Sequence, residues 1–429
     1  MRKRAYYAEY IYYEGKVHRD AYLIVVGDKI NGIASHADDQ GYDIEHFHNS
    51  AIFPGLINTH THLPMVLFRG MADDLPLMTW LKKHIWPAES KWLCEEFVIT
   101  ATQLAAAEMI KSGTTACCDM YFFSDTVASV LRLAGMKATI GVGVLDFATP
   151  FGNNADNYLE RAAEFYLKYE KDKLITPSVC PHAPYTVSPE SYRKCVDFCG
   201  KHDILLNTHL SEAPHENGDS ITRHGKTPAQ VMNDAGVLDI RNNLAHCIHL
   251  TDEDIALMGS KGANVSHCLQ SNMKLGNGFA PVIKMMDAGI NVSIGTDGAA
   301  SNNDLDMIQE MNSIALVHKA LNHDATALSA ETVIKMATVN GAKTLGMNRT
   351  GELKRGNQAD FIVVSFDEPH MTPVFNPLSH LVYSANSSDV TAVYVDGQCL
   401  MKDRKLTTLD EEKVKDDARR WAQKIKDSK

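Results

Sequence analysis

The chain has 429 residues, of which 45% are hydrophobic and 22% charged, and a net charge of −11. This length exceeds what one small core needs, so we predict one large domain and a smaller one. The negative charge, without any compensating cluster of Lys and Arg, argues against binding to a nucleic-acid backbone.

Signals for export or membrane insertion are not evident in the sequence. Residues 2–4 are basic, but no apolar run follows them as it would in a secretory signal. No run approaches the ~18 apolar residues of a membrane span. The nine Cys are scattered without a CxxC pair, which is typical of reduced thiols. We expect a cytoplasmic protein without a membrane segment, and the sequence leaves a homo-oligomer open.

The middle of the chain alternates short apolar runs with amphipathic segments, such as residues 94–111 and 188–201. Eight strands with intervening helices favour an α/β fold, the TIM (β/α)8 barrel. A doubly wound open sheet is the alternative, but it seldom has eight such units without a Gly-rich phosphate turn, and none is present. The predicted strands are residues 51–58, 114–121, 138–144, 175–180, 204–208, 244–247, 263–266 and 291–295.

The two ends of the chain instead contain short strands with tight turns, typical of an antiparallel sheet. Neither end alone offers enough apolar residues to bury a core. We therefore predict that residues 1–53 and 350–429 form one composite, small β-sandwich-like domain beside a barrel of residues 54–349. A helix over residues 410–426 closes the chain and should present a solvated amphipathic face.

A His-x-His pair ends the first predicted barrel strand. Side chains i and i+2 share one face of a strand, so His60 and His62 point the same way. Two imidazoles converging at the carboxyl end of a strand make half of a metal site. Taken alone, the pair fits equally well with two packed polar histidines at a strand-to-loop junction.

Ionisable side chains also follow five further strands, at the end where TIM barrels place their active sites. This recurrence predicts a metal site, because packing does not explain polar groups at six converging strand ends. Three imidazoles and a carboxylate suit Zn²⁺ or a similar divalent ion with an open position for water. We predict His60, His62, His209 and Asp297 as ligands of one metal ion. The other strand-end residues are His182, Glu212, His246, His249 and His267.

The order of these motifs resembles the amidohydrolase superfamily. The matching segments are Pro54-Gly-Leu-Ile-Asn-Thr-His60-Thr-His62, His209-Leu-Ser-Glu212, Ala245-His-Cys-Ile-His249 and Gly295-Thr-Asp297-Gly. The sequence is similar in particular to the mononuclear aminohydrolase branch. Within it, residues 273–282 and 295–303 resemble the 5'-methylthioadenosine/S-adenosylhomocysteine deaminases.

This resemblance implies metal-dependent hydrolytic deamination of the adenine 6-amino group of a 5'-modified adenosine. Attack at C6 needs a nucleophile, which a metal supplies at neutral pH, and an acid that protonates ring nitrogen N1. Glu212, three residues past His209, is placed to be that acid, and Asp297 can be both ligand and base. His246 matches the family's histidine that orients the nucleophile, while His267 competes with it for a supporting or substrate-binding role.

Residues for substrate binding follow from the same resemblance. Glu89 matches the family's carboxylate that binds the ribose hydroxyls, and His182 matches another substrate contact. Trp80 and His84, on the segment after the first strand, could cover the base or the 5' group. Residues 301–303 are predicted to form a capping turn before a helix that starts at Asp304.

One departure concerns the substrate's tail. Family members that act on S-adenosylhomocysteine tend to carry Arg after strand three and in the next loop, whereas residues 139–154 contain none and Arg161 comes first. We therefore predict that 5'-methylthioadenosine or adenosine is a better substrate than S-adenosylhomocysteine, unless Arg69 or Lys274 reaches the pocket.

Three alternatives remain open. The chain could be an aminohydrolase or chlorohydrolase acting on guanine, a pterin or a triazine, although Glu89 with His182 favours a ribose-bearing substrate. A binuclear amide hydrolase would carry a carbamylated Lys at the end of strand four, where residues 178–182 have none. A non-enzymatic scaffold on the same fold would lack bound metal.

Overall fold

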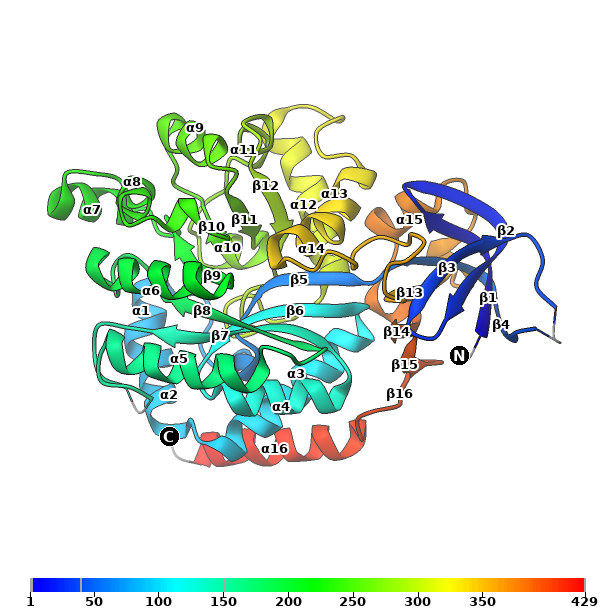
Figure 1. Ribbon diagram of the computed structural model, residues 1–429, viewed down its shortest axis with the longest axis horizontal. Helices are drawn as coiled ribbons and strands as arrows, with labels where there is room; N and C mark the ends of the chain where they lie inside the picture. The colour runs from blue at the N-terminus through cyan, green and yellow to red at the C-terminus, as the bar shows by residue number, and fades with distance from the viewer. Residues whose placement is uncertain (1–2, 39–40, 150, 428–429) are drawn as a thin grey trace.

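The computed structural model describes residues 3–38, 41–149 and 151–427. Two eight-stranded sheets organise these residues (Figure 1). One sheet is parallel and forms the centre of a barrel, and the other is built from both ends of the chain and lies beside the barrel. This is the predicted TIM-like barrel with a separate sheet from the termini.

The barrel strands follow one another in chain order, each parallel to the next. The last strand returns beside the first, where the Asp297 backbone N–H donates to the His60 carbonyl at 2.9 Å. Asn58 Nδ2 also donates to Thr296 Oγ1 at 2.7 Å. The strands are β5 (Leu56–Thr61), β6 (Thr114–Tyr121), β7 (Lys137–Val144), β8 (Ile175–Pro181), β9 (Leu205–Leu210), β10 (Asn242–His246), β11 (Asn264–His267) and β12 (Asn291–Ile294).

The predicted first strand divides between the two sheets. Residues 51–54 belong to β4 (Asp43–Pro54) of the terminal sheet, and β5 begins at Leu56. The chain crosses at Gly55, where a Cβ atom would lie 2.2 Å from Thr115 Oγ1. Only glycine fits this close approach, so one continuous apolar run serves two sheets.

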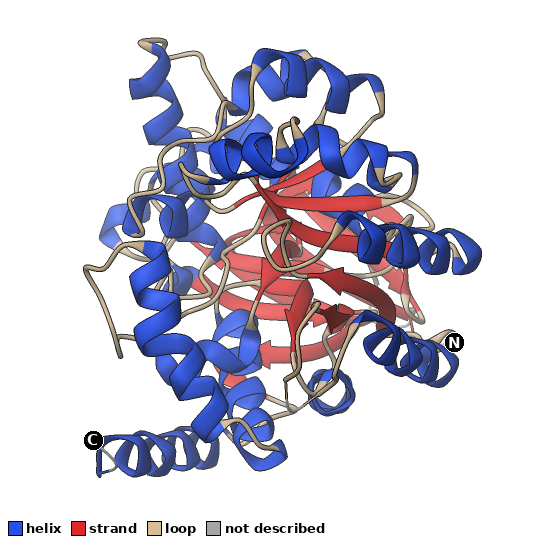
Figure 2. Ribbon diagram, turned by 90° about the vertical axis from the view of Figure 1, so that its left-hand side faces the viewer, coloured by secondary structure: helices blue, strands red, loops and turns tan. Residues whose placement is uncertain are grey.

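Helices enclose the barrel on its outer side (Figure 2). The predicted helices at residues 94–111 and 188–201 appear as α3 and α6. From residue 95 to the terminal strands, the helices are α3 (Glu95–Lys111), α4 (Ser124–Ala134), α5 (Ala155–Tyr169), α6 (Pro189–His202), α7 (Glu216–His224), α8 (Pro228–Asp234), α9 (Asp252–Ser260), α10 (Leu269–Lys274), α11 (Val282–Asp287), α12 (Met307–Asn322), α13 (Ala330–Met336) and α14 (Val339–Leu345).

A helical segment between β5 and α3 lies over the carboxyl ends of the strands. It runs through the 3-10 turn η1 (Leu63–Phe68), α1 (Leu77–Trp80), a π-helical turn η2 (Leu81–Ile85) and α2 (Trp86–Trp92). We call residues 77–92 the cover segment. Single π-helical turns are rare and often mark functional sites.

The terminal sheet joins both ends of the chain around one core. The rings of Tyr6, Phe361 and Tyr394 lie 4.4 to 5.0 Å apart between centroids. Strand β1 pairs parallel to β4, and the other pairings are antiparallel. In order across the sheet the strands are β16 (Lys405–Leu406), β15 (Gln398–Lys402), β14 (Val390–Val395), β13 (Phe361–Ser365), β4, β1 (Lys3–Tyr13), β2 (Lys16–Val26) and β3 (Lys29–Ala34).

A buried ion-pair cluster ties the terminal sheet to the barrel. Lys137 opens β7, and its Nζ lies 2.6 Å from a carboxylate oxygen of both Asp360 and Asp396. Lys137 and Asp360 are almost fully buried. The predicted domain boundaries, after residue 53 and before residue 350, stay a prediction.

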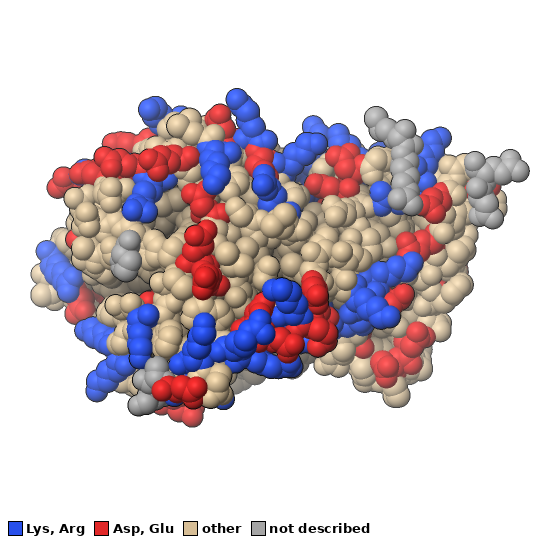
Figure 3. All heavy atoms as spheres, turned by 90° about the horizontal axis from the view of Figure 1, so that it is seen from below, with Lys and Arg blue, Asp and Glu red and all other residues tan. Residues whose placement is uncertain are grey.

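The chain ends in the predicted helix, α16 (Glu411–Asp427), which packs against α3 of the barrel (Figure 1). Trp421 meets Phe97 edge to face, with ring centroids 5.2 Å apart. The other face of α16 is charged, and Lys413 pairs with Asp417 at 2.7 Å. Seen from below, the side on which α16 lies in Figure 1, the surface has charges of both signs interspersed (Figure 3). The helix is therefore amphipathic, as predicted, and buries its apolar face on the barrel.

None of the helices in the described part of the chain combines the length and hydropathy required to cross a bilayer.

Candidate metal and substrate site

His60 at the end of β5 and His62 just after it point into the barrel mouth, as the His-x-His spacing predicts. His60 is fully buried, and its Nδ1 and Nε2 have no hydrogen-bond partner. His62 Nε2 lies 3.2 Å from Asp297 Oδ1, and His60 Nε2 lies 3.6 Å from the same oxygen. Buried ring nitrogens without a partner raise the free energy of the folded protein unless another group bonds to them.

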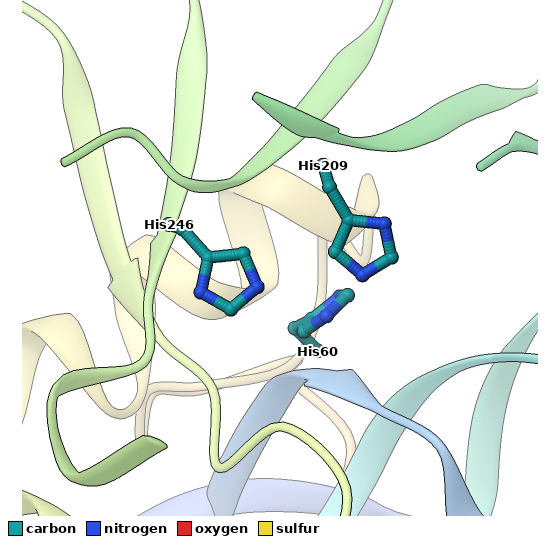
Figure 4. A group of neighbouring side chains, drawn as sticks. All are labelled: His60, His209 and His246. Carbon is teal, nitrogen blue, oxygen red and sulfur yellow. The ribbon is translucent and has the colours of Figure 1, made fainter. Parts of the chain in front are cut away.

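His209 at the end of β9 and His246 at the end of β10 face His60 (Figure 4). His209 Nε2 lies 3.3 Å from His62 Nε2. The other nitrogen of each of these two rings donates to a backbone carbonyl, from His62 to Met120 at 2.6 Å and from His209 to His182 at 2.7 Å. Such bonds fix the ring orientation and direct the Nε2 atoms toward the centre, as around metal ligands in proteins.

Asp297 follows β12 with its backbone in the left-handed region, at φ +64°. Its Oδ2 accepts hydrogen bonds from Ser271 at 2.6 Å and Ser301 at 2.9 Å, which leaves Oδ1 for the histidines. Burial opposes the charged carboxylate, but the nearby imidazoles of His60 and His62 bring the pKa of Asp297 well below its usual range. The carboxylate is therefore ionised at neutral pH.

The two serines were not predicted in this role. Ser301 was expected to cap a helix starting at Asp304, but α12 begins at Met307 with Asp306 as its cap. Ser301 instead donates to Asp297 because the turn after β12 folds back over the strand end. Its position four residues after Asp297 was the available signal, whereas nothing local marks Ser271.

These side chains form two overlapping groups with ligand atoms within 4.8 Å of one another. One group contains His60, His62 and Asp297, and the other contains His60, His209 and His246. Imidazole nitrogens and one carboxylate oxygen suit a divalent ion such as Zn²⁺. A bound ion would also give the orphaned Nε2 of His60 a partner, so the residues fit a metal centre.

Glu212 and His246 lie together at the edge of this cluster. His246 Nε2 lies 3.8 Å from Glu212 Oε2, and its Nδ1 donates to Asn272 Oδ1 at 2.8 Å. Glu212 Oε1 accepts from Asn277 Nδ2 at 3.1 Å. Burial raises the pKa of Glu212, so this carboxyl retains its proton to higher pH than an exposed Glu would.

Glu89 lies on α2 of the cover segment, and its Oε1 accepts a 2.6 Å hydrogen bond from the hydroxyl of Tyr121 at the end of β6. Burial raises the pKa of Glu89 to about 7. His182 follows β8, and its Nδ1 forms a 2.8 Å hydrogen bond with Thr186 Oγ1. Burial lowers the pKa of His182 to about 3, so the ring is neutral.

A pocket of about 350 Å³ connects these groups. Its lining includes the cluster residues His62, His209, His246 and Asp297 and also Glu89, His182, Glu212 and Trp80. The predicted His84 and His267 are not among its described lining residues; His267 Nε2 lies 3.0 Å from His318 Nε2. Apolar side chains make up much of the remaining wall: Leu77, Leu81, Ile85, Leu145, Phe147 and Phe151.

The described lining of the pocket contains no Lys or Arg. Arg69 pairs with Glu108, and Lys274 Nζ lies 2.6 Å from Asp73, so both cations are engaged outside the lining. The segment after β7 supplies apolar wall where an Arg would be expected for S-adenosylhomocysteine. Within residues 139–154, residue 150 lies outside the described residues.

Comparison with known proteins matches residues 51–400 to the model of the amidohydrolase family. The chain belongs to the amidohydrolase family. A 5-methylthioadenosine/S-adenosylhomocysteine deaminase of Thermodesulfovibrio yellowstonii is 44% identical over 380 residues, 88% of this chain and 87% of that protein. A 5'-deoxyadenosine deaminase of Methanosarcina barkeri is 43% identical over 411 residues, 95% of this chain and 93% of that protein.

Among solved structures, an adenosine deaminase of Xanthomonas campestris with bound zinc has a TM-score of 0.95 and 36% identity. The alignment covers 98% of each chain. The two proteins therefore share both the barrel and the terminal sheet.

Proposed function

We propose that this amidohydrolase is a zinc-dependent deaminase of adenine nucleosides that carry a small, uncharged 5' substituent, such as 5'-methylthioadenosine, 5'-deoxyadenosine or adenosine. The observation that carries the proposal is the pocket, which joins the His/Asp cluster to Glu89 through an apolar wall whose described residues include no Lys or Arg. The deaminase relatives support the same reaction. We propose the cytoplasm as its location, since that compartment keeps free thiols such as these nine reduced.

We assign His60, His62, His209 and Asp297 as ligands of a single divalent ion. When bound there, the ion lowers the pKa of water and so supplies a nucleophile at neutral pH. The ligand histidines must be neutral for this. The carboxylate of Asp297 raises the pKa of His62 to about 9 against the effect of burial, so metal binding releases a proton from this pair.

The chain's own residues then move the protons. The reaction forms a C6–O bond and breaks the C6–N bond, so that water and the nucleoside give the inosine analogue and ammonia. Glu212 donates its proton to ring nitrogen N1 as C6 becomes tetrahedral, and its raised pKa keeps that proton available. Asp297 takes one proton from water and returns it to the leaving amine, and the proton left on the C6 hydroxyl restores the acid form of Glu212 as the C6 carbonyl forms. His246 orients the nucleophile through Nε2, because Nδ1 is committed to Asn272.

Binding of the nucleoside is divided between polar and apolar parts of the pocket. We assign Glu89 to the ribose hydroxyls and His182 to a further polar contact with the substrate. Trp80 lies in the cover segment and lines the pocket, where it can pack on the base. The apolar wall from Leu145, Phe147 and Phe151 takes the 5' substituent.

The lack of a cation decides the preferred tail. A homocysteine carboxylate entering this pocket would lose water without gaining an ion pair. A hydrogen bond to a charged group contributes ~1.5–3 kcal/mol, on the order of ten- to a hundredfold in kcat/KM. We expect kcat/KM for 5'-methylthioadenosine to exceed that for S-adenosylhomocysteine by about this ratio.

Ammonia release from 5'-methylthioadenosine, 5'-deoxyadenosine, adenosine, S-adenosylhomocysteine and guanine tests the proposal with one zinc-loaded preparation. Turnover of guanine in place of the nucleosides would contradict the substrate class. An equal or higher kcat/KM for S-adenosylhomocysteine would refute the argument from the apolar wall while leaving deamination intact.

A further inference from the structure

We propose that Tyr121 is a positioning residue: its hydroxyl fixes the carboxylate of Glu89 and thereby sets the distance between the ribose site and the reacting centre. The proposal rests on the ribose-binding role assigned to Glu89 above. Tyr121 ends β6, is 8% exposed and lines the pocket, and its hydroxyl donates to Glu89 Oε1 at 2.6 Å. A distance this short is typical of a hydroxyl bound to a charged carboxylate.

Glu89 depends on this contact because its own helix is short and only partly buried. Helix α2 has seven residues, none of them fully buried, and it follows the π-helical turn η2. Across the residues that the structure describes, Tyr121 donates the one side-chain hydrogen bond assigned to the carboxylate of Glu89. A flexible Glu on such a helix would otherwise lose conformational entropy each time it bound a sugar.

Tyr121 is itself rigid and close to the metal cluster. It lies in the pairing of β6 with β7, opposite Val142. Its ring centroid is 6.4 Å from that of His62. The side chain of Tyr121 therefore extends from the proposed ligand histidines to the cover segment. When the ribose binds Glu89, this fixed distance places the base beside the nucleophile. Tyr121 leaves Oε2 of Glu89 available to the sugar.

The geometry predicts a pattern that depends on the sugar. Adenosine has the 2' and 3' hydroxyls that Glu89 would bind, whereas 2',3'-dideoxyadenosine lacks them. In Tyr121→Phe the ring remains but the hydroxyl is lost. We expect kcat/KM for adenosine to fall about ten- to a hundredfold, mostly through KM, which is the usual effect of losing one hydrogen bond to a charged group. The value for dideoxyadenosine should change less than about threefold.

Two further variants make the test specific. Glu89→Gln removes the carboxylate and should reduce the preference for adenosine over dideoxyadenosine at least as much as Tyr121→Phe. Tyr185→Phe removes the other tyrosine hydroxyl of the pocket lining, and should change both substrates by a common factor. Zinc content and thermal unfolding of each variant establish that the metal centre and the fold are intact.

Each outcome separates the two ideas. If Tyr121→Phe lowers kcat/KM for adenosine and dideoxyadenosine by the same factor, or leaves both values unchanged, the positioning role is refuted. If Glu89→Gln erases the preference for the riboside while Tyr121→Phe retains it, Glu89 binds ribose without help from Tyr121. A wild-type enzyme that shows no preference for the riboside contradicts the ribose site itself.

Discussion

Replacement of Glu212 by Gln separates proton donation from every other feature of the site. The amide has the same shape as the carboxyl and can still accept from Asn277 Nδ2, which holds Glu212 Oε1 at 3.1 Å. None of the four proposed metal ligands is altered. The one property lost is the acidic proton that we assign to N1 of the purine.

The expected loss in kcat is roughly 10²–10⁴, the usual contribution of a general acid. It corresponds to ~3–5 kcal/mol of transition-state free energy. Steady-state kinetics with 5'-methylthioadenosine and zinc analysis of the same sample measure both quantities. KM should change little, because the ribose and tail contacts are elsewhere in the pocket.

The pH dependence gives a second readout of the same role. Burial raises the pKa of Glu212, so the wild-type enzyme retains the active, protonated form to higher pH. Its kcat should fall as pH rises through that pKa, and the Gln variant should lack this limb. Near-normal turnover of the zinc-loaded variant would refute N1 protonation by Glu212.

Two further predictions concern the metal and the fold. Elemental analysis should find about one zinc per chain, and two ions per chain would contradict a mononuclear site. Asp297→Asn should abolish turnover even where zinc remains. His246→Asn should retain zinc but lose turnover. Lys137→Met should lower the free energy of unfolding by about 3–5 kcal/mol because it leaves Asp360 buried without its cation, while Lys168→Met at an exposed pair should change it by less than about 1 kcal/mol in denaturant titrations.

Periodicity was sufficient to predict much of the barrel and the proximity of its polar residues. Side chains two apart share a face of a strand, and parallel strands end at one edge, so residues from distant segments were expected together. The structure brings His60, His62 and Asp297 together in one group and His60, His209 and His246 in another, with His209 Nε2 3.3 Å from His62 Nε2. Their assignment as ligands still rests on donor chemistry and family resemblance.

The remaining contacts depend on how loops and ends fold back, which local patterns do not encode. The bond from Tyr121 to Glu89 joins residues 32 positions apart, and that from Ser271 to Asp297 needs the turn after β11. The change of sheet at Gly55 interrupts no apolar run, so the sequence reads as one strand. Tertiary packing decides each of these features.

An arginine introduced into the apolar wall tests why the tail preference exists. Ala148 lines the pocket, is exposed, and lies after β7, in the region where S-adenosylhomocysteine deaminases tend to carry Arg. In Ala148→Arg the stem can remain at the surface while the guanidinium reaches the tail carboxylate.

We expect kcat/KM for S-adenosylhomocysteine to rise about three- to fivefold, the effect of an exposed ion pair of up to ~1 kcal/mol, and that for 5'-methylthioadenosine to stay unchanged. Ala148→Gln is the matched control, because it adds length and hydrogen bonding without charge. The gain should shrink at high ionic strength, since an exposed ion pair is screened by salt. An equal gain in the Gln variant, or none in the Arg variant, would show that something other than the missing cation limits S-adenosylhomocysteine.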